Sequence, residues 1–357
     1  MKIATLSFYS GINKRGVERW TYDLANHLSG KFEMVVYQNG PSEPGAQYST
    51  ISLNLNFDVN RREILSPILK IPFLDYKSRR VAVFALKLLP KLWRENFDII
   101  IPTDGGWEPA FIRILTWLRR KKMVIVGHAG IGWDDRNNIW CFPDCFVGLS
   151  AFASKWAKTV NPWIKTVLIP DGVDVQKFSP RGKKIALDLI PPVALYAGAL
   201  EKSKRIDLII KAVSKVRTLS LLIVGEGGEK ERLEKLAAKF LRGRYKFLKY
   251  PFEKMPQVYR ACDIFLSASI PYYSFEMVIA EAIATNLPVI ANDDPIRKEI
   301  VGNAGYLTNP ADSKKFSKII EKALKANWGN KPRKQAKKFS WETIAQKYEE
   351  LFQNLIS

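Results

Sequence analysis

The sequence predicts an α/β protein built from two doubly wound, Rossmann-like domains. Short apolar runs that end at Gly or polar turns alternate with amphipathic stretches of helical period, and this alternation occurs twice along the chain. A chain of 357 residues is also longer than one ordinary hydrophobic core accommodates. We therefore expect domains at residues 1–170 and 171–340, with a junction near IPDGVDVQKFSPRGKK, followed by a helix at residues 341–357.

The first domain opens with a βαβ pattern. KIATLSF is typical of a buried strand, VERWTYDLANHL of an amphipathic helix, and FEMVVYQ of a second strand. Three later runs, FDIIIPTDGG, KKMVIVGHAG and DCFVGLS, predict further strands that stop at Gly or polar turns. Parallel strands buried on both faces have this apolar character.

The pattern then restarts in the second domain. Predicted strands are PVALYAGAL, LSLLIVGEGG, YKFLKYPF, DIFLSAS and LPVIAND, and predicted helices are RIDLIIKAVSKV, EKERLEKLAAKFL, MPQVYRAC and the helix that contains Glu281. Ligands of open parallel sheets bind beyond the carboxyl ends of the strands, so we expect a site in a cleft between the two domains. Glycine-rich helix entries in these loops suit an anion such as a diphosphate.

The composition narrows the possible partners. The chain has 56 Lys and Arg against 35 Asp and Glu, a net charge of +21, which favours nucleic acid, anionic lipid head groups or phosphorylated substrates. Three cysteines and two histidines argue against a disulfide framework and against a His-based metal site. Without a long apolar run or a signal-peptide pattern, we expect a cytoplasmic protein, either soluble or peripheral on the cytoplasmic face of the membrane.

Six ordered stretches carry a resemblance. PDGVDVQKFSP, YAGALEKSKRIDLIIKA, LLIVGEGGEKERLEKLA, YRACDIFLSAS, EAIATNLPVIAND and FSWETIAQKYEELF resemble motifs of the family 4 retaining glycosyltransferases (glycosyl transferases group 1). RGVERWTYDLANHL is similar to that family's first glycine loop and helix. The resemblance implies the GT-B architecture, in which two Rossmann-like domains face each other across a cleft and the C-terminal helix crosses back onto the first domain.

Glu281 is the polar residue of an otherwise apolar or small stretch from Met277 to Thr285. An ionised carboxylate among apolar neighbours is costly unless something compensates it. The resemblance implies that Glu281 hydrogen-bonds the ribose hydroxyls of a nucleotide donor. The alternative is a buried Glu paired with a Lys or Arg.

The neighbouring residues depart from the family pattern. Tyr273 stands where the family usually has a Glu that contacts the transferred sugar, and Glu276 stands where a Gly is usual. Either the Tyr273 phenol donates to the sugar, or Glu276 supplies a carboxylate, or transfer is impaired. The resemblance also places four neighbours at the donor: Ser274, Phe275, Met277 and Val278.

A second departure concerns the diphosphate. The family commonly has an Arg where this chain has Ala199, whereas the Lys five residues later is retained as Lys204. Losing a preorganised cation weakens stabilisation of a departing nucleoside diphosphate. Lys202 or Arg205 could substitute, and the alternative for this segment is a solvated basic loop.

Two residues of the first domain complete the expected donor site. The resemblance implies that His128 hydrogen-bonds the donor sugar, although a lone His after a strand is often structural. Gly16 is a candidate phosphate neighbour, because a residue without Cβ lets backbone N–H groups approach closely. Asp104 could contact the acceptor, but an Asp before two glycines is more often a turn former.

The expected reaction is transfer of a sugar from a UDP- or GDP-sugar to an acceptor hydroxyl of a glycan, lipid or lipid-linked glycan, with retention of anomeric configuration. No tightly bound cofactor is expected, and a metal is not expected to be essential, because Lys and helix N-termini can neutralise the diphosphate. One alternative is a catalytically weak relative that binds the donor and acts as an interaction partner. The other is a basic nucleic-acid-binding module, although the sequence contains no recognisable nucleic-acid-binding signature.

Residues 61–94 interleave Lys and Arg with aromatic and aliphatic residues, and RRKK follows at residues 119–122. Such a pattern suits the surface of an anionic membrane, but it is equally typical of an ordinary helix pair with its apolar stripe in the core.

Overall fold

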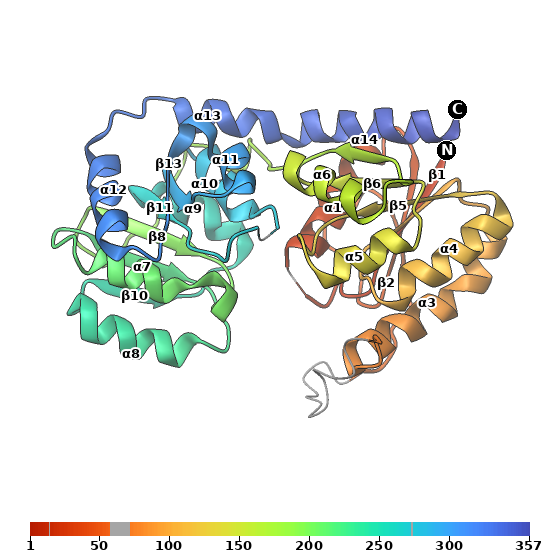
Figure 1. Cartoon of the computed structure of the whole chain (residues 1–357), viewed down its shortest axis with the longest axis horizontal. Coiled ribbons are helices and arrows are strands. Elements are labelled where there is room, and N and C mark those ends of the chain that lie inside the picture. The colour runs from red at the N-terminus through yellow and green to blue at the C-terminus, as the bar shows by residue number, and fades with distance from the viewer. Residues whose placement is uncertain (14, 58–71, 273) are drawn as a thin grey trace. The chain divides into compact units, whose positions relative to one another are not determined.

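The computed structural model describes residues 1–13, 15–57, 72–272 and 274–357 (Figure 1). Contacts divide the chain into two compact units, Met1–Asp171 with Trp341–Ser357 and Gly172–Ser340. Each unit is built around one parallel sheet. Part of the basic stretch at residues 61–94, from 61 to 71, lies outside the described residues, as does Tyr273.

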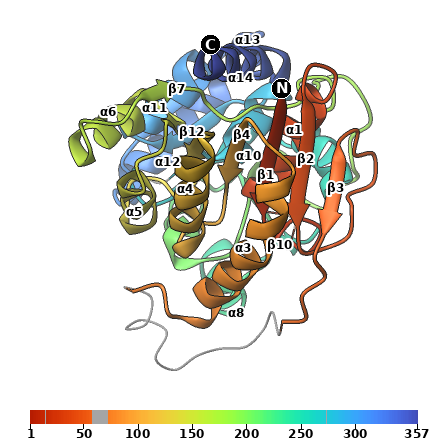
Figure 2. The same ribbon diagram turned by 90° about the vertical axis from the view of Figure 1, so that its right-hand side faces the viewer.

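Unit 1 contains a seven-stranded parallel sheet in the order β3-β2-β1-β4-β5-β6-β7. The strands are β1 (Lys2–Ser7), β2 (Glu33–Gln38), β3 (Ser49–Ser52), β4 (Ile99–Pro102), β5 (Lys122–Val126), β6 (Cys145–Gly148) and β7 (Thr166–Leu168). Strand β1 is central, because Thr5 pairs with Val36 of β2 and with Ile101 of β4. Figure 2 shows β3 at the edge beside β2.

The helices of unit 1 follow the strands in the doubly wound pattern. They are α1 (Gly16–Leu28), α3 (Tyr76–Arg94), α4 (Trp107–Arg119), α5 (Trp133–Trp140), α6 (Ala151–Val160) and α14 (Trp341–Ile356). One face of the sheet packs on α3 and α4 through residues such as Phe84 and Ile112. On the other side, α1 packs on α14, where the Trp20 and Tyr348 rings lie 5.9 Å apart. Helix α14 therefore completes the core of unit 1.

Unit 2 contains a six-stranded parallel sheet in the order β10-β9-β8-β11-β12-β13. The strands are β8 (Val193–Ala197), β9 (Ser220–Val224), β10 (Tyr245–Leu248), β11 (Ile264–Leu266), β12 (Val289–Asn292) and β13 (Gly305–Thr308). The central strands are almost entirely apolar and buried on both faces, as parallel strands covered by helices must be.

The helices of unit 2 cover both faces of this sheet. They are α7 (Ile206–Val213), α8 (Lys230–Leu241), α9 (Met255–Arg260), α10 (Met277–Ala284), α11 (Pro295–Val301), α12 (Ser313–Lys325) and α13 (Lys331–Ala336), with 3-10 turns η1 (Lys202–Lys204), η2 (Phe252–Lys254), η3 (Gly302–Ala304) and η4 (Lys337–Phe339). Helices α7, α8 and α12 share one apolar core with the sheet, and α10 contacts α9, α11 and α13. The predicted fold class, two doubly wound α/β units, is confirmed.

No helix within the described part of the chain is long and apolar enough to cross a membrane.

Candidate functional site

In unit 2, a buried ionic cluster is centred on Glu276, the residue that precedes α10. One carboxylate oxygen accepts a hydrogen bond from Lys204 Nζ at 2.8 Å, and the other lies 3.1 Å from Arg297 Nη2. The side chains of Glu276 and Arg297 are only 3% and 0% exposed. The hydroxyls of Ser267 and Ser269 also donate to this carboxylate. Two cations and two hydroxyls therefore surround one carboxylate.

This environment sets the charge of Glu276. Burial by itself would raise the pKa of the carboxyl, but Arg297 and Lys204 favour the charged form, and the pKa falls to about 2. The carboxylate is therefore ionised at any pH near neutrality. Arg297 Nη1 also lies 3.6 Å from Asp294 Oδ2, so the cluster combines two cations and two carboxylates.

Arg205, the residue after Lys204, does not contact Glu276 but binds main-chain carbonyls. Arg205, with a positive φ of 46°, ends the turn η1 and begins α7. Its guanidinium donates to the main-chain carbonyls of Ala268 and Ser269 at 2.7 and 2.6 Å. Arg205 thus ties the first helix entry of unit 2 to the segment after β11, whereas Lys202 is exposed.

Glu281 lies one turn into α10 and is 7% exposed. Tyr259, from α9, donates its phenolic hydroxyl to Glu281 Oε2 at 2.7 Å. Burial, followed by the charge of Glu281, raises the pKa of Tyr259 well above its ordinary value, so the phenol stays a donor. Glu281 thus accepts a hydrogen bond from a neutral group of the same unit.

Two glycine loops pack backbone against backbone beside these residues. Gly225, after β9, has a φ of +155°, and a Cβ there would lie 1.9 Å from the carbonyl oxygen of Gly198. A Cβ on Gly227 would lie 2.4 Å from the Leu200 carbonyl oxygen. Only glycine permits this approach. The loop after β8, which carries Ala199 and leads to Lys204, is therefore held by the loop after β9.

In unit 1, His128 follows β5 and is enclosed by other side chains. Its ring lies edge-on to Trp20, with centroids 4.6 Å apart, and its Nδ1 lies 3.9 Å from Asp171 Oδ1. The side chain is 8% exposed, and burial lowers the pKa of His128 to about 3. The imidazole is therefore neutral at physiological pH. Burial also raises the pKa of Asp171 to about 7.

Gly16 is the first residue of α1, at the carboxyl end of β1. The N-terminus of this helix is already engaged by a capping box, in which the Glu18 carboxylate accepts the Arg15 N–H at 3.0 Å. A Gly at this position still gives the entry loop a backbone without a side chain.

Two further carboxyls follow β4, of which Glu108 is buried and Asp104 partly buried. Asp104 accepts the Phe8 N–H at 2.6 Å, and Glu108 accepts the Asp104 N–H at 3.0 Å. Burial raises the pKa of Asp104 to about 7, and burial together with the charge of Asp104 raises the pKa of Glu108 well above its ordinary value. Asp104 thus ties the loop after β4 to the end of β1.

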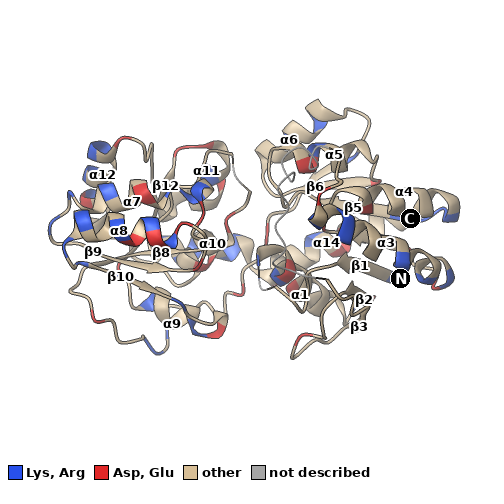
Figure 3. Ribbon diagram, turned by 90° about the horizontal axis from the view of Figure 1, so that it is seen from below, with Lys and Arg blue, Asp and Glu red and all other residues tan. Residues whose placement is uncertain are grey.

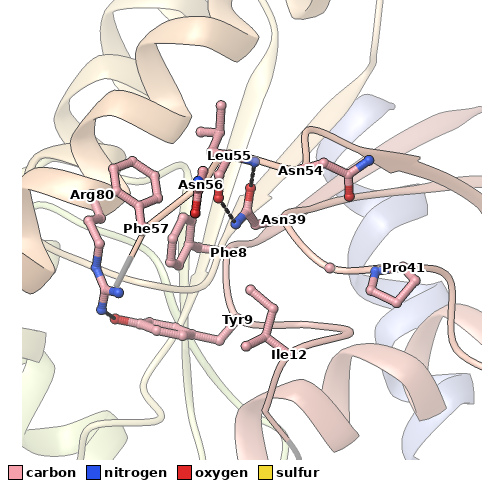
Figure 4. Close-up of a pocket in the computed structure, with 11 residues that line it drawn as sticks. Phe8, Tyr9, Ile12, Asn39, Pro41, Asn54, Leu55, Asn56, Phe57 and Arg80 are labelled. Atoms are coloured by element: carbon pink, nitrogen blue, oxygen red, sulfur yellow. Dashed lines mark hydrogen bonds between the residues drawn. The ribbon is translucent and has the colours of Figure 1, made fainter. Parts of the chain in front are cut away.

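A pocket of about 410 Å³ lies beyond the carboxyl ends of β1 and β2 (Figure 4). Its lining is Phe8, Tyr9, Ile12, Asn39, Gly40, Pro41, Asn54, Leu55, Asn56, Phe57 and Arg80. The Asn39 amide shapes the pocket, because it accepts the Leu55 N–H at 2.6 Å and donates to the Leu55 carbonyl at 3.0 Å. Arg80 donates to the Tyr9 hydroxyl at 3.3 Å.

Some of the predicted site residues lie close together in unit 2, whereas others belong to unit 1. Lys204 and Glu276 form an ion pair, and Glu281 lies on the helix that follows Glu276. The other predicted donor residues of that segment are partly buried Ser274, Met277 and Val278, and buried Phe275, whose ring contacts Phe339. Gly16 and His128 belong to unit 1. Tyr273 lies outside the described residues.

Sequence reasoning missed Arg297, Ser267, Ser269 and Tyr259. One signal was available: the two serines are spaced by two in DIFLSAS, so they point to the same side of an extended chain. No comparable local pattern marks Arg297, which belongs to a different helix. Among the side chains that the structure describes, no group of three or more His, Cys, Asp or Glu is arranged to hold a metal ion.

Comparison with known proteins agrees with this architecture. Residues 191–326 match the family "Glycosyl transferases group 1". An uncharacterized glycosyltransferase, MJ1069, of Methanocaldococcus jannaschii is 22% identical over 96% of this chain and 95% of its own length. Three further curated relatives match over 37% to 51% of their length.

Two solved structures superpose over both units. Sucrose-phosphate synthase from Thermosynechococcus elongatus has a TM-score of 0.80 at 20% identity, covering 99% of this chain and 98% of that one. HepE from Anabaena, in complex with UDP and glucose, has a TM-score of 0.76 at 19% identity and covers 99% of each chain. At these identities the likeness establishes the fold. The chain therefore has the GT-B fold, carries a glycosyl transferases group 1 domain at residues 191–326, and is a homologue of glycosyltransferases.

Proposed function

We propose that the protein transfers a sugar from a UDP- or GDP-sugar to a hydroxyl of a glycan, lipid or lipid-linked glycan, with retention of the anomeric configuration. The observation that carries the proposal is the arrangement of Lys204, Glu276 and Glu281 at one end of the sheet of unit 2, inside the segment that matches the family. UDP bound to a protein of the same fold supports a nucleotide donor.

Glu281 is the proposed ribose ligand. A carboxylate accepts about four hydrogen bonds, so the bond from Tyr259 is compatible with two more from cis hydroxyls. Hydrogen bonds to an ionised carboxylate are strong, and burial strengthens them further. Tyr259 has a positioning role in this proposal, because its hydroxyl bonds one oxygen of the carboxylate. The neighbouring Ser274, Phe275, Met277 and Val278 complete the proposed donor wall.

Lys204 is the proposed diphosphate ligand, and Glu276 acts on the donor through it. The ion pair at 2.8 Å holds the ammonium in one place, so little side-chain entropy is lost when a diphosphate binds. Tyr273 and His128 are the proposed contacts to the transferred sugar, and Gly16 supplies backbone N–H groups to the phosphates. His128 would serve as a neutral hydrogen-bonding group, since its pKa is about 3.

The proposed chemistry needs no protein nucleophile. The bond between the anomeric carbon and the leaving phosphate oxygen breaks, the acceptor oxygen bonds to the same face of that carbon, and the acceptor proton passes to the departing phosphate. The protein supplies orientation and charge stabilisation, which account for most of the rate in many enzymes.

The acceptor sugar is assigned to the pocket at the ends of β1 and β2. Aromatic rings such as Tyr9 and Phe57 offer flat apolar surfaces to the C–H face of a sugar, and amides such as Asn56 can bond its hydroxyls. A volume of about 410 Å³ accommodates a ligand of this size. Tyr9→Ala should raise the KM for the acceptor without changing affinity for the nucleotide.

The test is a panel of nucleotide sugars, screened for protein-dependent release of nucleoside diphosphate, with titration calorimetry of UDP and GDP in parallel. Glu281→Gln keeps the size of the side chain but removes the charge, and it should weaken nucleotide binding at least tenfold. Glu321→Gln, on the exposed face of α12, is the matched control. Wild-type protein that binds neither nucleotide would refute the proposal. Product anomers resolved by NMR decide between retention and inversion.

A donor-binding relative with weak catalysis remains the second candidate, and one observation favours it. The cation at Lys204 is already paired with Glu276, and Ala199 supplies no second cation. Preorganised charges of this kind are worth roughly 100-fold in rate when removed singly. Nucleotide binding without turnover for any donor in the panel would identify this case.

A further inference from the structure

The imidazole of His128 is held in place, but one of its nitrogens has no hydrogen-bond partner. The residue follows β5, and its main-chain N–H donates to the Val126 carbonyl at 2.9 Å. Trp20 of α1 packs against the ring, and the side chain is 8% exposed. Nε2 is buried, and no residue within the described ranges forms a hydrogen bond with it. Buried polar atoms are nearly always paired, so this nitrogen is a candidate to bind a ligand.

Asp171 lies beside the other nitrogen of this ring. It comes shortly after β7 and is the last residue of the first stretch of unit 1. Its Oδ1 lies 3.9 Å from His128 Nδ1, its side chain is 7% exposed, and Oδ1 has no hydrogen-bond partner among the described residues. The backbone before it is fixed, because the Ile169 N–H donates to the Gly148 carbonyl at 3.1 Å. The fold therefore keeps a carboxyl next to the imidazole.

No cation competes with the imidazole for Asp171. Lys and Arg are spread over the helices of both units, for example on α8 and α12 (Figure 3). None of those in the described part of the chain forms an ion pair with Asp171. Tyr348 of α14 also interacts with Asp171, and burial followed by the charge of this carboxyl raises the pKa of the phenol well above its ordinary value. The two titratable groups that face Asp171, His128 and Tyr348, are therefore both uncharged near neutrality.

The charge of Asp171 favours one position of the proton on the ring over the other. Burial lowers the pKa of His128 to about 3, so the ring is neutral and has one N–H and one lone pair. An ionised carboxylate only accepts hydrogen bonds, so it favours the proton on Nδ1 and leaves Nε2 with the lone pair. A protonated carboxyl donates to Nδ1, and the ring proton is then favoured on Nε2. At 3.9 Å the two atoms form no direct hydrogen bond, but a charge acts strongly over this distance in a buried site.

We propose that Asp171 is a positioning residue that sets the tautomer of His128, and so determines whether Nε2 accepts or donates a hydrogen bond at the transferred sugar. This inference rests on the proposed function, in which His128 contacts that sugar. With Asp171 ionised, Nε2 accepts from a sugar hydroxyl, which keeps electron density on the sugar while positive charge develops at the anomeric carbon. This state is the productive one. The ring carries one proton in both states, and Asp171 exchanges its own proton with water.

Asp171 changes its charge near neutral pH, whereas the neighbouring acids act on other groups. Burial raises the pKa of Asp171 to about 7. Asp135 of α5, with a pKa that burial raises to about 8, accepts the N–H groups of Ala129 and Gly130, so it holds the loop after His128 and not the ring. The acids of α1 are bound by arginines, Glu18 by Arg15 and Asp23 by Arg19.

NMR of the protein labelled with ¹⁵N-histidine tests the proposal directly. The chain has only two histidines, so each imidazole is resolved. His27, whose Nδ1 donates to the Asp23 carbonyl at 2.7 Å, gives a reference signal for a ring with its proton on Nδ1. The proton of His128 should lie mainly on Nδ1 at about pH 8.5 and mainly on Nε2 at about pH 5.5. In Asp171→Asn the two populations should be the same at both pH values, because an amide has no charge to change.

The matched control is Asp104→Asn. It removes another carboxyl of unit 1 with a pKa of about 7, but one that accepts the Phe8 N–H. The pH-dependent change in His128 should persist in this variant. If it also persists in Asp171→Asn, another carboxyl such as Asp135 sets the tautomer and the proposal is wrong. A wild-type ring that keeps one tautomer at both pH values would overturn the proposal without any variant.

Kinetics connect the tautomer to transfer. With the donor that the nucleotide-sugar panel identifies, kcat of wild type should fall about tenfold from about pH 8 to about pH 6, and kcat of Asp171→Asn should not follow this change. UDP and GDP affinity should be equal in the two proteins, because Asp171 acts at the sugar. A wild-type kcat that does not follow the NMR change would overturn the proposal. Turnover without the NMR change would refute the role of Asp171 alone, whereas the NMR change without turnover for any donor would count against the proposed function.

Discussion

An acidic cluster follows parallel strands in each unit, but the carboxyl pKa is lowered in unit 2 and raised in unit 1. In unit 2, Glu276 is enclosed by Lys204, Arg297 and two hydroxyls, and its pKa falls to about 2. In unit 1, Asp104 and Glu108 accept mainly backbone N–H groups, and burial raises the pKa of both. Glu276 and Glu108 are both buried, so the difference in their pKa values comes from their partners. Unit 2 thus has fixed charges where a charged donor is proposed to bind, whereas the carboxyls of unit 1 have raised pKa values that favour the uncharged form.

The largest expected effect comes from removing a cation of unit 2. Arg297→Met leaves Glu276 buried with one fewer positive charge, and the free energy of unfolding should fall by about 3–5 kcal/mol. Denaturant titration measures the change, with Arg217→Met, an exposed arginine, as the control. Adding Glu276→Gln should restore part of the loss. A loss below about 1 kcal/mol in Arg297→Met would show that the cluster is not the tight unit described above.

The second prediction concerns acid stability. Because the folded pKa of Glu276 is depressed from 4.5 to about 2, its contribution to stability is complete above pH 4.5 and is lost as the pH falls toward 2. The contribution amounts to about 3 kcal/mol. Unfolding measured at several pH values from neutrality into the acid range should therefore decline less steeply in Glu276→Gln than in wild type. Parallel curves for the two proteins would contradict the depressed pKa.

The third prediction has the opposite sign. Asp104 has a folded pKa of about 7, raised from 3.8, so its protonated form stabilises the fold at low pH and this contribution is lost as the pH rises through 7. Asp104→Asn keeps an acceptor for the Phe8 N–H but cannot ionise. Its free energy of unfolding should exceed that of wild type at about pH 8, by about 4 kcal/mol, and not at about pH 4. Equal curves for both proteins would show that Asp104 is not held protonated.

The smallest expected effect concerns Glu281, which receives a hydrogen bond from a neutral phenol. Tyr259→Phe removes that bond and should lower the free energy of unfolding by about 1–2 kcal/mol. Nucleotide affinity measured on the same variant separates stability from function, because a positioning role for Tyr259 predicts weaker UDP or GDP binding as well. If the variant binds UDP and GDP as tightly as wild type, Tyr259 contributes to stability alone.

Sequence pattern predicted the central strands but missed three edge strands. Strands β8, β9 and β11 are buried apolar runs, and their pattern is unambiguous. Strands β3, β7 and β13 are short and only partly buried, so their residues do not form a continuous apolar run. Edge strands have one neighbour and a solvated side, which removes the signal that periodicity uses.

The candidate site was predicted less completely, for a related reason. Glu281 was identifiable because a charged residue interrupts an apolar run. The cluster around Glu276 was not, because Lys204 is 72 residues away and Arg297 belongs to a separate helix. Such contacts are created by the order of the strands in the sheet, which brings distant loops to one edge. The composition and the local spacing of residues therefore do not predict which distant side chains come into contact.

The position of α14 has a consequence for how the protein is made. Trp341, Tyr348 and Phe352 are buried against unit 1, although unit 2, Gly172–Ser340, is translated before them. During synthesis, Trp20 and its apolar neighbours in unit 1 therefore stay uncovered until α14 leaves the ribosome. The nascent chain is exposed to aggregation throughout the synthesis of unit 2, and a messenger truncated before the codons of α14 would yield a chain whose first unit never closes.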